Sequence, residues 1–159
     1  DGKDYIEILG RQENTRVRKY IRKDFVASHL NLDKYKLLLP KSNGTWKFGE
    51  TLSAPLMAEP NLGHTQTFIS IGALDSAFEA ESLLKYVKTK FCRAMLGILK
   101  ITQDNKQQTW SNIPLQDFNK KSDIDWSKSI SEIDKQLYTK YDLDKKEIDF
   151  IESHVKAMK

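Results

Sequence analysis

The chain has 159 residues, of which 39% are hydrophobic, enough for one domain or one domain with an appendage. Its formal net charge of +4 and isoelectric point near 9.0 are compatible with a polyanionic partner. A single cysteine, Cys92, excludes an internal disulfide framework and suits a reducing cytosol, and no apolar run reaches the ~18 residues that a membrane span needs.

The excess of positive charge lies near the N-terminus. Residues 1–59 hold 11 Lys and Arg against 8 Asp and Glu, whereas residues 119–159 hold 9 of each. The run from Arg16 to Lys23 contains five cations and no acid, with Tyr20 among them. Such a density neutralises phosphates, and Tyr20 could pack on a sugar or a base. An ordinary solvated face explains the run about equally well.

Short apolar runs and turn signals follow. Residues 36–40 predict a buried strand that ends at Pro40, residues 55–58 form another apolar run, and residues 65–71 alternate like a strand. The loop 41–47 carries amide, hydroxyl and cationic groups that could read base edges. A plain turn is the favoured interpretation of this loop, and the same holds for the segment around Gln66.

From Asp75 the apolar period becomes helical. One face of a helix through residue 100 is predicted to hold the apolar side chains Leu83, Val87, Phe91, Ala94 and Ile98. Basic residues fall largely outside that stripe. They form either a cationic recognition face or an ordinary solvent-exposed face of the helix. The buried position expected for Cys92 suits a small hydrophobic residue better than a reactive thiol.

The remaining segments predict a strand and two further helices. Residues 113–118, with Pro114 inside them, are predicted to form a strand. Ser129 and Asp144 each precede a glutamate by three residues, which is the capping-box pattern at the start of a helix. We expect Trp126 to pack with Phe150 and Tyr138 and to hold this helical tail on the body.

No recognised catalytic constellation occurs in the sequence. An adenine methyltransferase needs a glycine-rich loop for its methyl donor and an Asn/Asp-Pro-Pro-Tyr/Phe site, and neither motif is present. Glu132, Asp134 and Lys135 come nearest to a metal-dependent nuclease site, but their spacing is wrong and capping explains Glu132 better. We therefore expect the chain to be non-catalytic and to hold no cofactor or metal of its own.

Several of these segments, taken in order, resemble one bacterial family. They are the helix with Thr89-Lys90-Phe91-Cys92-Arg93, the segment 113–118, and the tail from Asp125 to Glu152. Over roughly residues 34–158 the chain is similar to the C-terminal part of restriction–modification proteins that carry an adenine-specific DNA methyltransferase domain upstream. Residues 67–118 also resemble the target-recognition domains of type I specificity subunits. Cys92 and Asp142 depart from the family, which often has an aromatic residue and a glycine there.

The resemblance implies a fold and a function. The fold is an α+β body over residues 1–118, in which a mixed sheet of residues ~35–113 carries a basic helix. A helical C-terminal extension over residues 119–159 packs on this body. The function is recognition of double-stranded DNA beside the methyltransferase domain of a larger parent protein in the bacterial cytoplasm. S-adenosylmethionine and any Mg²⁺ would bind elsewhere in that parent. Because the chain begins at Asp1 without methionine, we expect it to be a piece of this larger protein.

The candidate DNA-binding residues are cations and one amide from three segments. They are Arg16, Arg18, Lys19, Arg22, Lys23, Lys41, Asn43, Lys47, Lys88, Lys90 and Arg93. The resemblance favours Lys90 and Arg93, and it predicts that Arg93→Ala weakens DNA binding and leaves the fold intact. The alternative function is a docking module, in which residues 119–159 bind the methyltransferase or a second copy and no part touches DNA.

Overall fold

The structure is a computed structural model that describes residues 4–42, 47–99 and 107–158. In these ranges the chain is an α+β protein with two three-stranded sheets and five α-helices. The strands are β1 (Tyr5–Gln12), β2 (Thr15–Arg22), β3 (Tyr35–Pro40), β4 (Leu56–Ala58), β5 (Leu62–His64) and β6 (Phe68–Leu74). The helices are α1 (Ala77–Lys88), α2 (Lys90–Leu99), α3 (Gln107–Trp110), α4 (Ile130–Lys140) and α5 (Lys145–His154).

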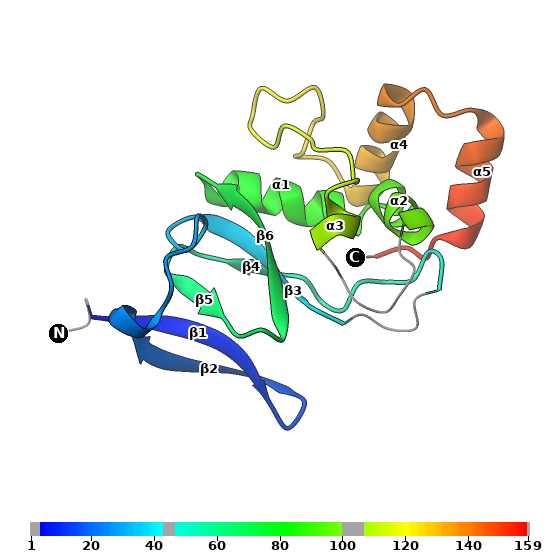
Figure 1. Ribbon diagram of the computed structural model, residues 1–159. Coiled ribbons are helices and arrows are strands. Elements are labelled where there is room, and N and C mark those ends of the chain that lie inside the picture. Colours follow the sequence, from blue (N-terminus) through cyan, green and yellow to red (C-terminus); the bar gives the residue numbers. More distant parts are fainter. Residues whose placement is uncertain (1–3, 43–46, 100–106, 159) are drawn as a thin grey trace.

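The two classes of element are segregated in space. Figure 1 shows β1 and β2 at one end of the molecule and α4 and α5 at the other, with β3 and β6 between them. The α+β class that the sequence predicts is therefore confirmed, whereas the single mixed sheet over residues 35–113 is replaced by two small sheets.

The N-terminal sheet is built on a hairpin. β1 and β2 are antiparallel and pair in continuous register from Gln12–Thr15 to Tyr5–Arg22. The two residues of the turn, Glu13 and Asn14, have φ of 49° and 62°. Positive φ at both positions is the type I′ geometry that matches the right-handed twist of paired strands. Neither strand is predicted from the sequence, because the cations of β2 hide its alternation.

The two sheets meet through apolar residues. β5 adds to β1 in parallel, which gives the order β2-β1-β5, and the second sheet has the order β4-β3-β6 with antiparallel pairs. Leu9 and Leu62 of the first sheet pack with Leu38, Ala58 and Phe68 of the second in one buried cluster. The predicted strand at residues 36–40 is confirmed as β3. The predicted strand at residues 65–71 begins later, at Phe68.

A buried lysine lies near the start of β3. The Nζ atom of Lys36 donates to the carbonyl oxygens of Leu32 at 3.2 Å and Lys34 at 3.1 Å. Burial lowers the pKa of this ammonium group because removal from water disfavours its charge. Lys36 thereby closes the turn that leads into β3 and is not available to a ligand.

The helix predicted from residue 75 to residue 100 is two helices. Thr89, between α1 and α2, has an extended backbone with φ −60° and ψ 151°. Its hydroxyl donates to the carbonyl oxygen of Tyr86 at 2.6 Å and accepts from the N–H of Cys92 at 3.1 Å. Phe91 and Ala94 of α2 are buried as predicted, whereas Ile98, the last position of the predicted stripe, is 69% exposed.

Both predicted capping boxes are confirmed. Ser129 caps α4 and Asp144 caps α5, each with a reciprocal bond from the glutamate three residues later. The two helices share one hydrophobic core with α1 and α2, in which Ile133, Leu137 and Val155 are buried. The tail is thus held by the same core as the body.

Two expectations for the C-terminal half are wrong. Residues 113–118 form no strand; the hydroxyl of Tyr86 in α1 donates to the carbonyl oxygen of Pro114 at 2.6 Å. Trp126 is buried as expected, but its ring packs with Tyr86 and Phe118 and not with Phe150. Among the residues described, no helix has the length and apolar character to cross a membrane.

Candidate nucleic-acid interface

The exposed cations of β2 lie along a free edge of the N-terminal sheet. β2 is the outer strand in the order β2-β1-β5, and no strand in the described part of the chain pairs with its other side. Because the turn has two residues, Gln12 and Thr15 form a hydrogen-bonded pair. From there, non-hydrogen-bonded and hydrogen-bonded pairs alternate along the two strands. Arg16, Arg18, Tyr20 and Arg22 therefore direct their main-chain groups toward the free edge, and their side chains share one face.

Three of these cations have side-chain partners at or near the surface. Arg18 pairs with Glu7 at 3.0 Å, Arg22 pairs with Asp24, and Lys19 donates to the side-chain oxygen of Gln12 at 3.2 Å. The side chain of Arg18 is 50% exposed. Surface ion pairs of this kind contribute only about 0–1 kcal/mol. An incoming phosphate could therefore replace them at small cost.

Two arginines face each other next to the turn. Arg11 of β1 is opposite Arg16 of β2, at a position where the side chains of paired strands come closest. Arg16 donates to the carbonyl oxygen of Ala54 at 2.6 Å and lies over the ring of Phe68, whereas Arg11 donates to the carbonyl oxygen of Asn14. Like charges directly opposite each other destabilise a sheet, and an anion between them would relieve the repulsion.

Lys41 and the turn at residues 65–67 extend this surface. The N–H of Lys41 donates to the carbonyl oxygen of Thr67, and the N–H of Thr65 donates to the carbonyl oxygen of Leu9, both at 2.9 Å. Pro40 pairs with Phe68, on which Arg16 rests. We define the cationic patch as the exposed cations on and beside the hairpin: Arg11, Arg16, Arg18, Arg22, Lys23 and Lys41, together with Lys19, whose side chain leaves β2 on the opposite face of the strand.

Lys47, at the other end of the loop 41–47, does not join the patch. Lys47 is exposed, but it precedes Phe48 and Gly49, which pack against α2 and the segment after α5. Asn43 lies outside the described residues. The loop thus contributes Lys41 to the surface near the hairpin and Lys47 to the helical half.

Arg93 is not a surface residue, so its prediction as a DNA contact is wrong. It is 2% exposed, and its guanidinium donates to the carbonyl oxygens of Lys88 at 3.2 Å, Glu50 at 3.3 Å and Lys156. Burial lowers the pKa of this group. These bonds join three segments of the chain, and the buried side chain is not accessible to a phosphate.

The neighbouring lysines are also used within the fold. Lys90 pairs with Glu152 of α5, and its side chain is 17% exposed. Lys85 donates to the carbonyl oxygens of Trp126 at 2.7 Å and Lys128 at 3.0 Å. Lys88 is half-buried at the end of α1. The α1–α2 segment therefore presents no row of free cations, and a role of Lys88 and Lys90 in DNA binding stays a prediction.

The carboxylate of Asp134 occupies the start of α2. It accepts from the N–H groups of Lys90 at 3.0 Å and Phe91 at 2.9 Å. Burial raises its pKa to about 6, although the two N–H groups oppose that shift. Asp134 is thus a helix cap and not a metal ligand. Glu132 caps α4, and no cluster of three metal-ligating side chains occurs among the described residues.

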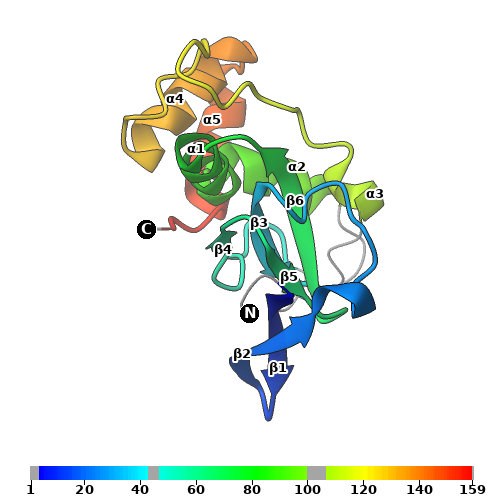
Figure 2. The same ribbon diagram turned by 90° about the vertical axis from the view of Figure 1, so that its left-hand side faces the viewer.

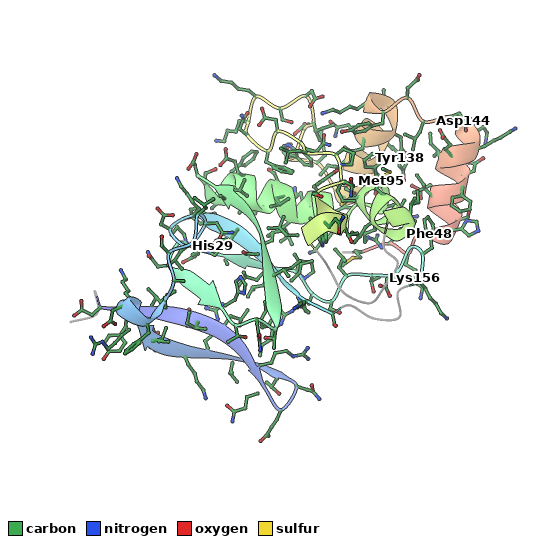
Figure 3. The ribbon with its side chains drawn as sticks, viewed as in Figure 1. His29, Phe48, Met95, Tyr138, Asp144 and Lys156 are labelled. Carbon is green, nitrogen blue, oxygen red and sulfur yellow. The ribbon has the colours of Figure 1, made fainter. Side chains whose placement is uncertain are left out.

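A second surface feature is an apolar groove between α2 and α5. Its volume is about 390 Å³, and the residues that line it include Phe48, Met95, Ile98, Leu143 and Phe150. Figure 3 labels Phe48 and Met95, which reach the groove from the loop before Gly49 and from α2. The groove carries Lys146 and Glu147 and so has no dominant charge.

Three residues near the hairpin were missed as candidates. Arg11, Gln12 and Asn14 are exposed beside the cations of β2. The signal that could have found them is the two-residue segment Glu13-Asn14 between two strand-like runs. This segment is a weaker hairpin signal than the usual Asn-Gly.

Comparison of the chain with protein families, curated proteins and solved structures finds no match.

Proposed function

We propose that the chain is the DNA-recognition part of a bacterial restriction–modification protein and that it contacts duplex DNA through the cationic patch. The observation that supports this proposal is the clustering of seven exposed cations from β1, β2 and the end of β3. Each cation that neutralises a phosphate releases condensed counterions, which favours binding. The exposed turns beside the patch supply amide and hydroxyl groups for contacts to bases.

In this proposal the catalytic steps belong to other parts of the parent protein. A separate methyltransferase domain would bind S-adenosylmethionine and turn the target adenine out of the stack, and any Mg²⁺ would bind there or in a nuclease domain. The role of this chain is to hold the DNA site in place in the bacterial cytoplasm. Phosphate contacts fix its position on the duplex, and base contacts select the sequence.

The test is binding to a random 30-base-pair duplex, measured by fluorescence anisotropy at several salt concentrations. The wild-type chain should bind, and its affinity should fall steeply as salt rises. In the triple variant Arg18→Gln, Lys19→Gln, Lys23→Gln, the slope of log affinity against log salt should shrink by about 0.9 for each phosphate that is no longer neutralised. Absence of binding by the wild-type chain at low salt would contradict the proposal.

A matched control removes the same charge elsewhere. Lys121, Lys135 and Lys145 are exposed residues of the C-terminal half, away from the patch. The triple variant that replaces them with glutamine has the same net charge as the patch variant. It should retain the salt slope of the wild-type chain. If both variants lose affinity equally, binding reflects net charge and not the patch.

The alternative function, docking to the methyltransferase domain without DNA contact, is favoured by one observation. The groove between α2 and α5 exposes Phe150 and Ile98, and an apolar groove of this kind can receive an amphipathic helix. Ile98→Asp adds a charge to the groove at a mostly exposed position. On the docking hypothesis this variant should lose capture by the methyltransferase half and leave DNA binding unchanged.

A further inference from the structure

Part of the hairpin extends beyond the third strand of its sheet. β5 pairs with β1 only at Glu7, Ile8 and Leu9. From Gly10 to Val17 the hairpin is therefore a two-stranded ribbon, and Figures 1 and 2 both show its turn pointing away from the helices. The residues from Arg11 to Arg16 are all exposed.

The width of the ribbon fits a groove of DNA. Paired strands lie about 4.7–4.9 Å apart, and side chains extend beyond them. The major groove of B-DNA is about 12 Å wide and admits a two-stranded β-ribbon. The minor groove, about 6 Å wide, is too narrow for both strands and their side chains.

The order of charges along the ribbon determines how it could enter. Glu13 is at the turn, Arg11 and Arg16 face each other behind it, and Arg18 follows. An acid is unfavourable beside phosphates, but on a groove floor it can accept from the amino group of cytosine. The arrangement suits entry with the turn first, so that Glu13 meets bases and the arginines meet the phosphates along the groove walls.

The turn also carries groups that recognise bases. The side-chain amide of Asn14 has no hydrogen-bond partner among the described residues, and Gln12 shares its side-chain oxygen with Lys19. Asparagine and glutamine can each bind the N6 and N7 atoms of adenine through two hydrogen bonds. Both side chains are exposed at the end of the ribbon.

We propose that the ribbon from Gly10 to Val17 enters the major groove of the DNA site and that Gln12 and Asn14 select the bases there. This inference rests on the proposed function, because it requires that the chain bind duplex DNA. It adds the element that reads sequence, the groove that it occupies and the residues that determine specificity.

The test is selection of preferred sequences from a random duplex library by the wild-type chain and by three variants, together with affinity for random DNA. Asn14→Gly removes the amide and keeps the turn, because glycine accepts positive φ. Gln12→Ala removes the second amide. Asn61 also has positive φ, 65°, but lies outside the ribbon, so Asn61→Gly is the matched control.

We expect Asn14→Gly and Gln12→Ala to relax the preference at one or two adjacent base pairs each, by about fivefold to 150-fold for each bidentate pair of hydrogen bonds that the variant can no longer form. Affinity for random DNA should stay within about twofold of wild type, because the phosphate contacts remain. Asn61→Gly should select the same sequences as wild type. Two outcomes would overturn this inference: a wild-type chain that binds DNA without sequence preference, or ribbon variants that retain the full sequence preference of the wild-type chain. A wild-type chain that does not bind DNA at all would overturn the proposed function as well.

Discussion

The hairpin of β1 and β2 and the helical half around α2 use the same basic residues in opposite ways. In the hairpin, Arg16, Arg18 and Arg22 are exposed; Arg18 pairs with the half-buried Glu7, and Arg22 pairs with the exposed Asp24. Around α2, Arg93 and Lys85 donate to main-chain carbonyl oxygens of distant segments. The density of cations in the sequence therefore does not identify an anion-binding surface. Such a surface is identified by whether the groups that each cation contacts lie at the surface or in the core.

The largest effect that would test this comparison is on stability. We expect Arg93→Ala to lower the free energy of unfolding by at least about 3 kcal/mol, because three carbonyl oxygens lose their donor at a buried site. Arg18→Ala should change it by less than about 1 kcal/mol, because its ion pair is exposed. Urea unfolding of both variants measures the difference. Equal stability of the two would contradict the assignment of Arg93 as a buried connector.

A second effect concerns pH and the carboxyl group of Asp134. Its folded-state pKa of about 6 is above the value of the unfolded chain, so protonation favours folding. The stabilisation is complete below pH ~4 and is lost as pH rises through about 6, and its size is at most about 3 kcal/mol. Asp134→Asn cannot ionise. The stability of wild type relative to this variant should therefore fall between pH 4 and pH 7, measured by urea unfolding.

The smallest effect separates stability from binding at one position of the hairpin. Arg11→Glu places an acid opposite Arg16 and should stabilise the free chain by about 0.2–1 kcal/mol, because an opposite-charge pair replaces a like-charge pair. The same variant should bind random duplex DNA more weakly. Thermal unfolding and fluorescence anisotropy measure the two quantities. A variant that is less stable than wild type would show that the two arginines do not repel each other.

Local signals predicted the local parts of the fold. β3 follows from a short apolar run before Pro40, and the starts of α4 and α5 follow from capping boxes at Ser129 and Asp144. The break at Thr89 was missed because threonine is compatible with a helix, and the carboxylate that caps α2 comes from Asp134, far along the chain. Such long-range partners leave no periodic trace in the sequence.

The candidate interface was predicted in part for the same reason. The run from Arg16 to Lys23 could be recognised from its charges alone, and it is exposed. The burial of Arg93 could not be recognised from the sequence, because its acceptors on Glu50 and Lys156 are 43 and 63 residues away. Arg11 was missed because it joins the patch only through pairing with Arg16 in the hairpin.

The segment that follows α5 has a consequence for the order of folding during synthesis. Lys156 accepts from Arg93 and donates to the carbonyl oxygen of Gly49, and the N–H of Leu52 donates to the sulfur of Met158 at 3.4 Å. Domains synthesised on the ribosome fold from the N-terminus as segments emerge. The hairpin can pair as soon as Arg22 has emerged, whereas Arg93 and the loop around Gly49 lack their partners until Met158 has left the exit tunnel. Until then the nascent helices keep apolar surface exposed, and that stage is where chaperones would bind this chain.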